Sequence, residues 1–254
     1  MSFFLTGSMF MSGAVVASFV GVVVARINTG QGFLTGRSRC DMCNATLAPS
    51  ALMPVISFIA SKGRARCCSA RVNFLAPLTE LLLGVLFALS YLKLGLSISL
   101  LGILLSLSAL LALVLYDLAH QILPPVLLSV FVVASALAGF LLASSFTDFL
   151  NTLFTAFCIA LFLAIIHFFS RGRAMGLSDA PLAFGLALLV GPSAITGFIF
   201  SFWIGALIGI VLLLKRPKSL KMNSEVPFAP FLAAGFLLAF FTQWNIFTLV
   251  TGLL

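Results

Sequence analysis

Only six residues of this 254-residue chain are acidic, so each can be considered as a possible site of chemistry. They are Asp41, Glu80, Asp117, Asp148, Asp179 and Glu225. Asp117 ends a long apolar run, in the stretch LVLYDLAHQILPPVLL, and Asp179 stands just before another apolar run. Because a carboxylate in or beside such a segment is costly to bury, we treat these residues as candidate functional groups.

Two aspartates together are able to hydrolyse a peptide bond. One ionised carboxylate activates a water molecule, and a second, protonated carboxylate donates to the substrate carbonyl. Two close carboxylates reach this state because their mutual repulsion raises one of the two pKa values. On spacing alone, an equally good explanation is that each aspartate caps a helix or reaches toward a membrane interface.

The composition indicates an integral membrane protein. Hydrophobic residues make up 62% of the chain and charged residues only 8%, with a mean hydropathy of +1.24. A soluble domain carries about a quarter charged residues, so this chain lacks the polar surface that water requires. The net charge of +8 is therefore expected to come from lysines and arginines in cytoplasmic loops. We expect the lipid bilayer to be a partner of the chain, and no nucleic acid.

The apolar runs predict an all-α bundle of about eight transmembrane helices. The sixth run is short, and Gly191-Pro192 separates it from the seventh, so it is compatible with a half-helix. We expect a first helix over 1–25, a small cytoplasmic loop domain over 26–74 and a membrane core over 75–254. The predicted spans are Phe3–Ala25, Leu75–Leu92, Leu96–Tyr116, Pro124–Ala143, Phe149–Phe169, Leu182–Val190, Ser193–Leu214 and Phe228–Leu253.

The basic residues predict the orientation of the bundle. With the N-terminus outside, thirteen of the fourteen lysines and arginines are cytoplasmic and only Lys93 is external, as the positive-inside rule requires. Glu80, Asp117 and Asp179 then share one depth, near the cytoplasmic face. Of the remaining acids, Asp148 is expected to be the N-cap of the fifth span. Asp41 and Glu225 are expected to be solvated charges of cytoplasmic loops.

Two motifs around the aspartates resemble those of the prepilin peptidases, a family of GxGD membrane aspartyl proteases. YDLAHQILPP is similar to the family's first aspartate motif, and GLSDAP, over Gly176–Pro181, is similar to its Gly-x-Gly-Asp-x-Lys motif. The sequence separation of 62 between Asp117 and Asp179 also suits that family. Further resemblance is carried, in order, by ASFVGVVVAR, MPVISF, PLTELLLG and VPFAPFLAAG.

The second motif departs from the family's pattern at two positions. Ser178 stands where the family has its second glycine, and Pro181 where it has lysine. Because a glycine permits unusual dihedral angles, Ser178 is expected to restrict the backbone beside Asp179. The loss of the lysine removes a cation that would bias the titration of the aspartate.

The resemblance implies a membrane endopeptidase that removes the leader of type IV prepilins, or of pseudopilins of secretion and DNA-uptake systems, at the cytoplasmic face. It assigns catalysis to Asp117 and Asp179, with His120, Gly176, Ser178 and Glu80 in support. A second family activity is N-methylation of the new N-terminus with S-adenosylmethionine. The alternatives are a proton- or cation-coupled transporter, or an inactive peptidase homologue that acts in pilus or secretion assembly.

Four cysteines of the first loop are candidate metal ligands. Cys40 and Cys43 form a CxxC pair, and the family carries a second such pair that would suit tetrahedral zinc. In this chain the expected positions of that second pair are Ala65 and Cys68, so Cys67 is a candidate replacement. The alternative is a loop that folds without metal.

The two histidines are expected to play different roles. His120 lies three residues after Asp117 on the same helical face, where it could donate a hydrogen bond to that carboxylate or bind the lipid headgroup region. His167, near the inner end of the fifth span, is expected to reach the interface or to bond a neighbouring helix.

Overall fold

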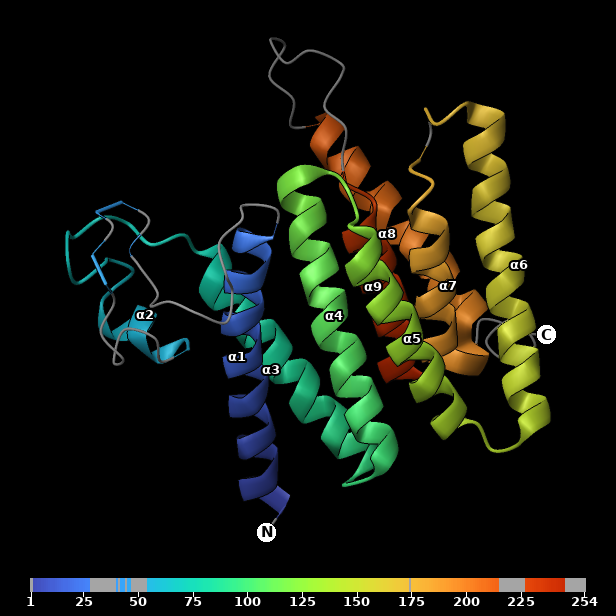
Figure 1. Ribbon diagram of the computed structural model, residues 1–254, viewed down its shortest axis with the longest axis horizontal. Coiled ribbons are helices and arrows are strands. Elements are labelled where there is room, and N and C mark those ends of the chain that lie inside the picture. The colour runs from blue at the N-terminus through green and yellow to red at the C-terminus, as the bar shows by residue number, and fades with distance from the viewer. Residues whose placement is uncertain are drawn as a thin grey trace. The chain divides into compact units, whose positions relative to one another are not determined.

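The described part of the chain is mainly helical. The computed structural model describes residues 2–27, 40, 42–43, 45–46, 54–173, 175–214 and 227–244. Over these residues, six helical stretches are long and apolar enough to cross a membrane, which confirms a multi-pass helical membrane protein (Figure 1). The helices are α1 (Ser2–Arg26), α2 (Ile56–Ala60), α3 (Leu75–Leu94), α4 (Ile98–His120), α5 (Pro125–Leu142), α6 (Phe146–Ser170), α7 (Asp179–Val190), α8 (Ala194–Leu214) and α9 (Ala229–Thr242).

The helix count differs from the predicted eight spans at two places. The 12-residue α7 continues through a 3-10 turn at Gly191–Ser193 into α8, so the two form one apolar stretch that is long enough to span. The described part of α9 has 14 residues, fewer than the roughly 20 that a full crossing needs. The helix does break at Gly191-Pro192, as the sequence predicted, but the half-helix itself stays a prediction.

The chain divides into two compact units, Met1–Leu100 and Leu101–Leu254. In the first unit α1 packs along α3. A Cβ atom on Gly13 would lie 2.7 Å from the Leu83 carbonyl oxygen, and one on Gly84 would lie 2.9 Å from that of Phe10. Small residues therefore let the two backbones touch, as is common between membrane helices. The predicted division at residues 25 and 74 stays a prediction.

In the second unit α7 is the buried helix. It packs against α5, α6, α8 and α9, and its only exposed residue is Pro181. Its sequence, DAPLAFGLALLV, is apolar on all sides, which is typical of a helix that neighbours surround. The surrounding helices expose large apolar side chains, as expected of surfaces that face lipid.

The turns beside the predicted aspartates follow their local sequence. Helix α4 ends at His120, and Pro124 and Pro125 begin α5 at its N-cap and first position, as the LPP sequence predicted. The prediction that Asp148 is the N-cap of α6 was wrong. Ser145 is its N-cap, with the Ser145 hydroxyl accepting from the Asp148 backbone N–H at 3.1 Å.

Candidate active site

Asp117 lies in the last turn of α4, where its side chain is only 7% exposed. Its carboxylate accepts a hydrogen bond from the backbone N–H of Ala229, the first residue of α9. A helix N-terminus carries partial positive charge, so this contact favours a carboxylate. The second oxygen, Oδ2, is buried and has no hydrogen-bond partner among the described residues. A buried carboxylate oxygen of this kind is available to bond a water molecule or a substrate.

Asp179 is the first residue of α7 and is also 7% exposed. Its Oδ2 accepts from the Gly176 backbone N–H at 3.1 Å, while the Gly176 carbonyl accepts from the Asp179 backbone N–H at 3.3 Å. The two residues thus bond each other reciprocally, through one side-chain bond and one backbone turn bond. These bonds orient the carboxylate from the turn that precedes the helix.

Ser178 adopts an ordinary backbone conformation in this turn. Its φ of −67° and ψ of −16° are ordinary right-handed helical angles that any L-residue adopts. The position therefore does not require the glycine that the family places there. Pro181 is exposed in the first turn of α7, where proline is tolerated because the first N–H groups of a helix lack partners inside it.

The structure brings the two aspartates together. The carboxylates of Asp117 and Asp179 lie close enough for their charges to interact, although 62 residues separate them in the chain. Both belong to the second unit, on α4 and α7. Their catalytic role stays a prediction, but the proximity that it requires is present.

The structure gives each histidine a contact that the sequence did not predict. His120 is exposed, and its ring contacts the Tyr116 ring at a centroid distance of 4.5 Å rather than bonding Asp117. His167 bonds the loop after its own helix instead of a neighbouring helix, through Nδ1 and the Met175 carbonyl at 2.9 Å. His167 also lies close enough to Asp179 for their charges to interact. The only sequence signal for the contact between His167 and Asp179 was the position of His167, at the end of the helix that precedes the second aspartate motif.

Glu80 holds a loop of the first unit. Its carboxylate accepts from the Val55 backbone N–H at 2.8 Å. Val55 has a φ of +58°, which is unusual for a β-branched residue because its Cβ crowds the backbone there. Glu80 on α3 therefore stabilises the strained backbone at Val55, which is a structural contact.

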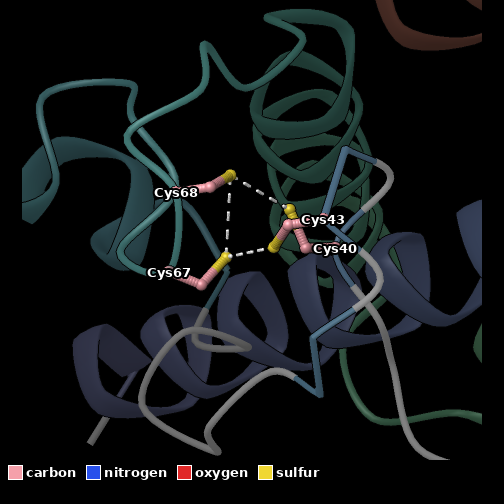
Figure 2. A group of neighbouring side chains, drawn as sticks. All are labelled: Cys40, Cys43, Cys67 and Cys68. Atoms are coloured by element: carbon pink, nitrogen blue, oxygen red, sulfur yellow. Dashed lines mark hydrogen bonds between the residues drawn. The ribbon is translucent and has the colours of Figure 1, made fainter.

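The four loop cysteines form one cluster in the first unit (Figure 2). Their sulfur atoms all lie within 4.8 Å of one another. Individual Sγ–Sγ distances are 3.3 Å for Cys43–Cys67, 3.7 Å for Cys40–Cys68 and 3.9 Å for Cys67–Cys68. With Zn–S bonds of about 2.3 Å, sulfurs at the corners of a tetrahedron are roughly 3.8 Å apart, so the donor set fits zinc.

The charge distribution in the cluster also suits metal ligands. Backbone N–H groups of Cys43 and Met42 lower the pKa of the Cys40 thiol to about 6. Hydrogen bonding with Cys43 and Cys40 raises the pKa of Cys67 to about 12. Without metal, Cys40 is therefore the cysteine that ionises most readily, and Cys67 keeps its proton. A metal cation bound to the sulfurs would displace the protons of the thiols.

These observations define a multi-pass helical membrane protein with two buried aspartates held together in one helical unit. A family model described as Bacterial Peptidase A24 N-terminal domain matches residues 11–94. The chain is 31% identical to the prepilin leader peptidase/N-methyltransferase of Bacillus subtilis, over 91% of this chain and 92% of that protein. The chain belongs to the prepilin leader peptidase family.

Two further relatives carry the same name. That of Myxococcus xanthus is 33% identical over 83% of this chain and 64% of the relative. That of Dickeya chrysanthemi is 29% identical over 89% of this chain and 88% of the relative. No solved structure matches the chain.

Proposed function

We propose that this protein is an aspartyl endopeptidase that removes the leader peptide of type IV prepilins or pseudopilins. The observation that carries the proposal is the pairing of Asp117 and Asp179, two buried carboxylates from distant parts of the chain whose charges interact. Buried charges normally have partners of opposite charge, so two acids placed together point to shared-proton chemistry.

The pair would cleave the peptide bond by general acid–base catalysis. The ionised carboxylate takes a proton from water, whose oxygen attacks the carbonyl carbon, while the protonated carboxyl group donates to the carbonyl oxygen. The tetrahedral intermediate then collapses: one of its hydroxyl groups returns a proton to the pair as the carbonyl re-forms, the C–N bond breaks, and the leaving amine takes a proton from the pair. Because the two groups titrate together, the acid and base roles belong to the pair and not to either residue.

The orientation that we propose places this pair at the cytoplasmic face of the cytoplasmic membrane. The positive-inside rule supports it, with the N-terminus outside and thirteen of fourteen basic residues inside. A prepilin substrate, as a single apolar helix with a basic leader in the cytoplasm, would then present its cleavage site at the depth of Asp117 and Asp179.

Leader removal from a co-expressed prepilin tests the mechanism. We compare the wild type with Asp117→Asn and Asp179→Asn by gel shift, with Asp148→Asn as a matched control because Asp148 is an exposed acid at the start of α6. Each active-site variant should lower the cleavage rate by about 10²-fold or more, and the control should not. Full processing of the prepilin by either active-site variant would overturn the proposal. No processing by the wild type would also overturn it, and would favour a transporter or an inactive homologue.

We also propose that the protein methylates the new N-terminus with S-adenosylmethionine, because the names of the three relatives described include N-methyltransferase. Mass spectrometry of the cleaved substrate tests this. A methyl group on the new N-terminus that depends on S-adenosylmethionine is expected, and its absence from a fully cleaved product would contradict the proposal.

We further propose that Cys40, Cys43, Cys67 and Cys68 bind one zinc ion. The Cys40 N–H bonds the Ala45 carbonyl at 2.9 Å, and the Ala65 N–H bonds the Ala70 carbonyl at 2.8 Å. The two turns are thus alike, with Ala65 in the place of Cys40 and Cys68 in the place of Cys43. The fourth sulfur then comes from Cys67, one residue before Cys68.

Metal analysis of the purified protein tests this ligand set. We expect one zinc per chain in the wild type, loss of zinc in Cys67→Ser, and recovery in Ala65→Cys/Cys67→Ser, which restores the CxxC spacing. Cys158→Ser, in α6, is the control and should keep its zinc. Full zinc in Cys67→Ser would exclude Cys67 as a ligand.

A further inference from the structure

A single peptide group lies between His167 and Asp179. The carbonyl of Met175 bonds His167 Nδ1 at 2.9 Å, and the N–H of Gly176 donates to Asp179 Oδ2 at 3.1 Å. These two atoms are the oxygen and the nitrogen of the same Met175–Gly176 peptide. Because a carbonyl oxygen only accepts, Nδ1 must carry the hydrogen in this arrangement. The imidazole, the peptide and the carboxylate therefore form one continuous hydrogen-bonded chain.

The end of α6 and its loop hold the imidazole in place. Arg171 ends the helix with a left-handed φ of +53°, and the Gly172 N–H donates to the His167 carbonyl at 2.9 Å. Gly172 has a φ of +76°, and a Cβ atom there would lie 3.3 Å from His167 Cε1. The loop therefore turns closely around the ring, as glycine permits at this φ.

From this chain of contacts we infer that His167 is a positioning residue, which orients the Asp179 carboxylate through the Met175–Gly176 peptide. A donor on a peptide carbonyl polarises the peptide and strengthens the bond that its N–H donates. His167 thus acts on Asp179 without touching the substrate. The inference rests on the proposed catalytic role of Asp179, and it adds a residue outside both aspartate motifs.

The test compares three substitutions of His167 in the purified full-length protein, with cleavage of a prepilin as the assay. The amide nitrogen of asparagine takes the position of Nδ1, so His167→Asn should keep the bond to Met175. In His167→Gln the nitrogen is placed one atom too far, and His167→Leu has no donor. We expect kcat to fall about 3- to 10-fold in the Leu and Gln variants, with KM unchanged, as for the loss of one hydrogen bond.

Two controls separate this inference from a purely structural role and from the proposed function. Phe169→Leu changes an exposed residue of the same helix end and should leave kcat unaltered. If His167→Leu fails to fold, the comparison of kcat between His167→Asn and His167→Gln still tests the inference. Equal kcat in these two variants, or wild-type kcat in His167→Leu, overturns the inference. Wild-type activity in Asp179→Asn overturns the proposed function instead.

Discussion

Substitution of Gly185 by alanine should disturb the contact that holds the Asp179 helix against α5. A Cβ atom on Gly185 would lie 2.6 Å from Phe131 Cε1 and 3.0 Å from its Cδ1. Carbon atoms in contact normally keep about 3.5–4.0 Å, so the ring or the helix must move by roughly 1 Å. The Phe131 side chain is fully buried, and the backbone of α7 is enclosed by four helices, so neither can move freely.

A matched control isolates the cost of that overlap. Gly209 lies in α8, and no atom comes within 4 Å of a Cβ atom placed there. Both substitutions gain the same helix propensity, about 1 kcal/mol, which cancels when the two variants are compared. Overpacking of a buried site costs about 1–3 kcal/mol. We therefore expect Gly185→Ala to be about 1–3 kcal/mol less stable than Gly209→Ala.

The assay is thermal unfolding of both variants in the same detergent, with prepilin cleavage measured in parallel. Gly185→Ala should melt at a lower temperature than Gly209→Ala. It should also cleave more slowly, because α7 begins at Asp179 and any displacement of the helix moves that carboxylate. Equal melting temperatures and equal cleavage rates would refute the packing that we describe around α7.

Substitutions at three further residues test the supporting positions. Ser178→Gly should leave activity within about twofold, because Ser178 already has helical dihedral angles, and a large gain would show that serine restricts the site. Glu80→Gln should keep the bond from the Val55 N–H, whereas Glu80→Ala should lose it and be less stable by about 1 kcal/mol. Equal melting temperatures for the Gln and Ala variants would contradict this. His120→Phe should keep the ring contact with Tyr116 and most of the cleavage activity, and complete loss would assign His120 a direct role.

Most helix positions could be predicted because hydropathy and helix signals are local. The LPP sequence located the turn between α4 and α5, and Gly191-Pro192 located the end of α7. The short α2 was missed, since five residues carry no periodic signal. The predicted last span runs to Leu253, and its final nine residues lie outside the described part of the chain.

The sequence alone determined that the protein belongs in a membrane and that Asp117 and Asp179 are its unusual acids, because composition and motif are one-dimensional properties. Only the tertiary structure decided what surrounds them. The Ala229 N–H on Asp117 and the sulfur of Cys67 beside Cys43 join residues far apart in the chain, and the His167 imidazole reaches the Asp179 turn from the helix that precedes it. Such contacts depend on how the helices and loops pack, which no local pattern encodes.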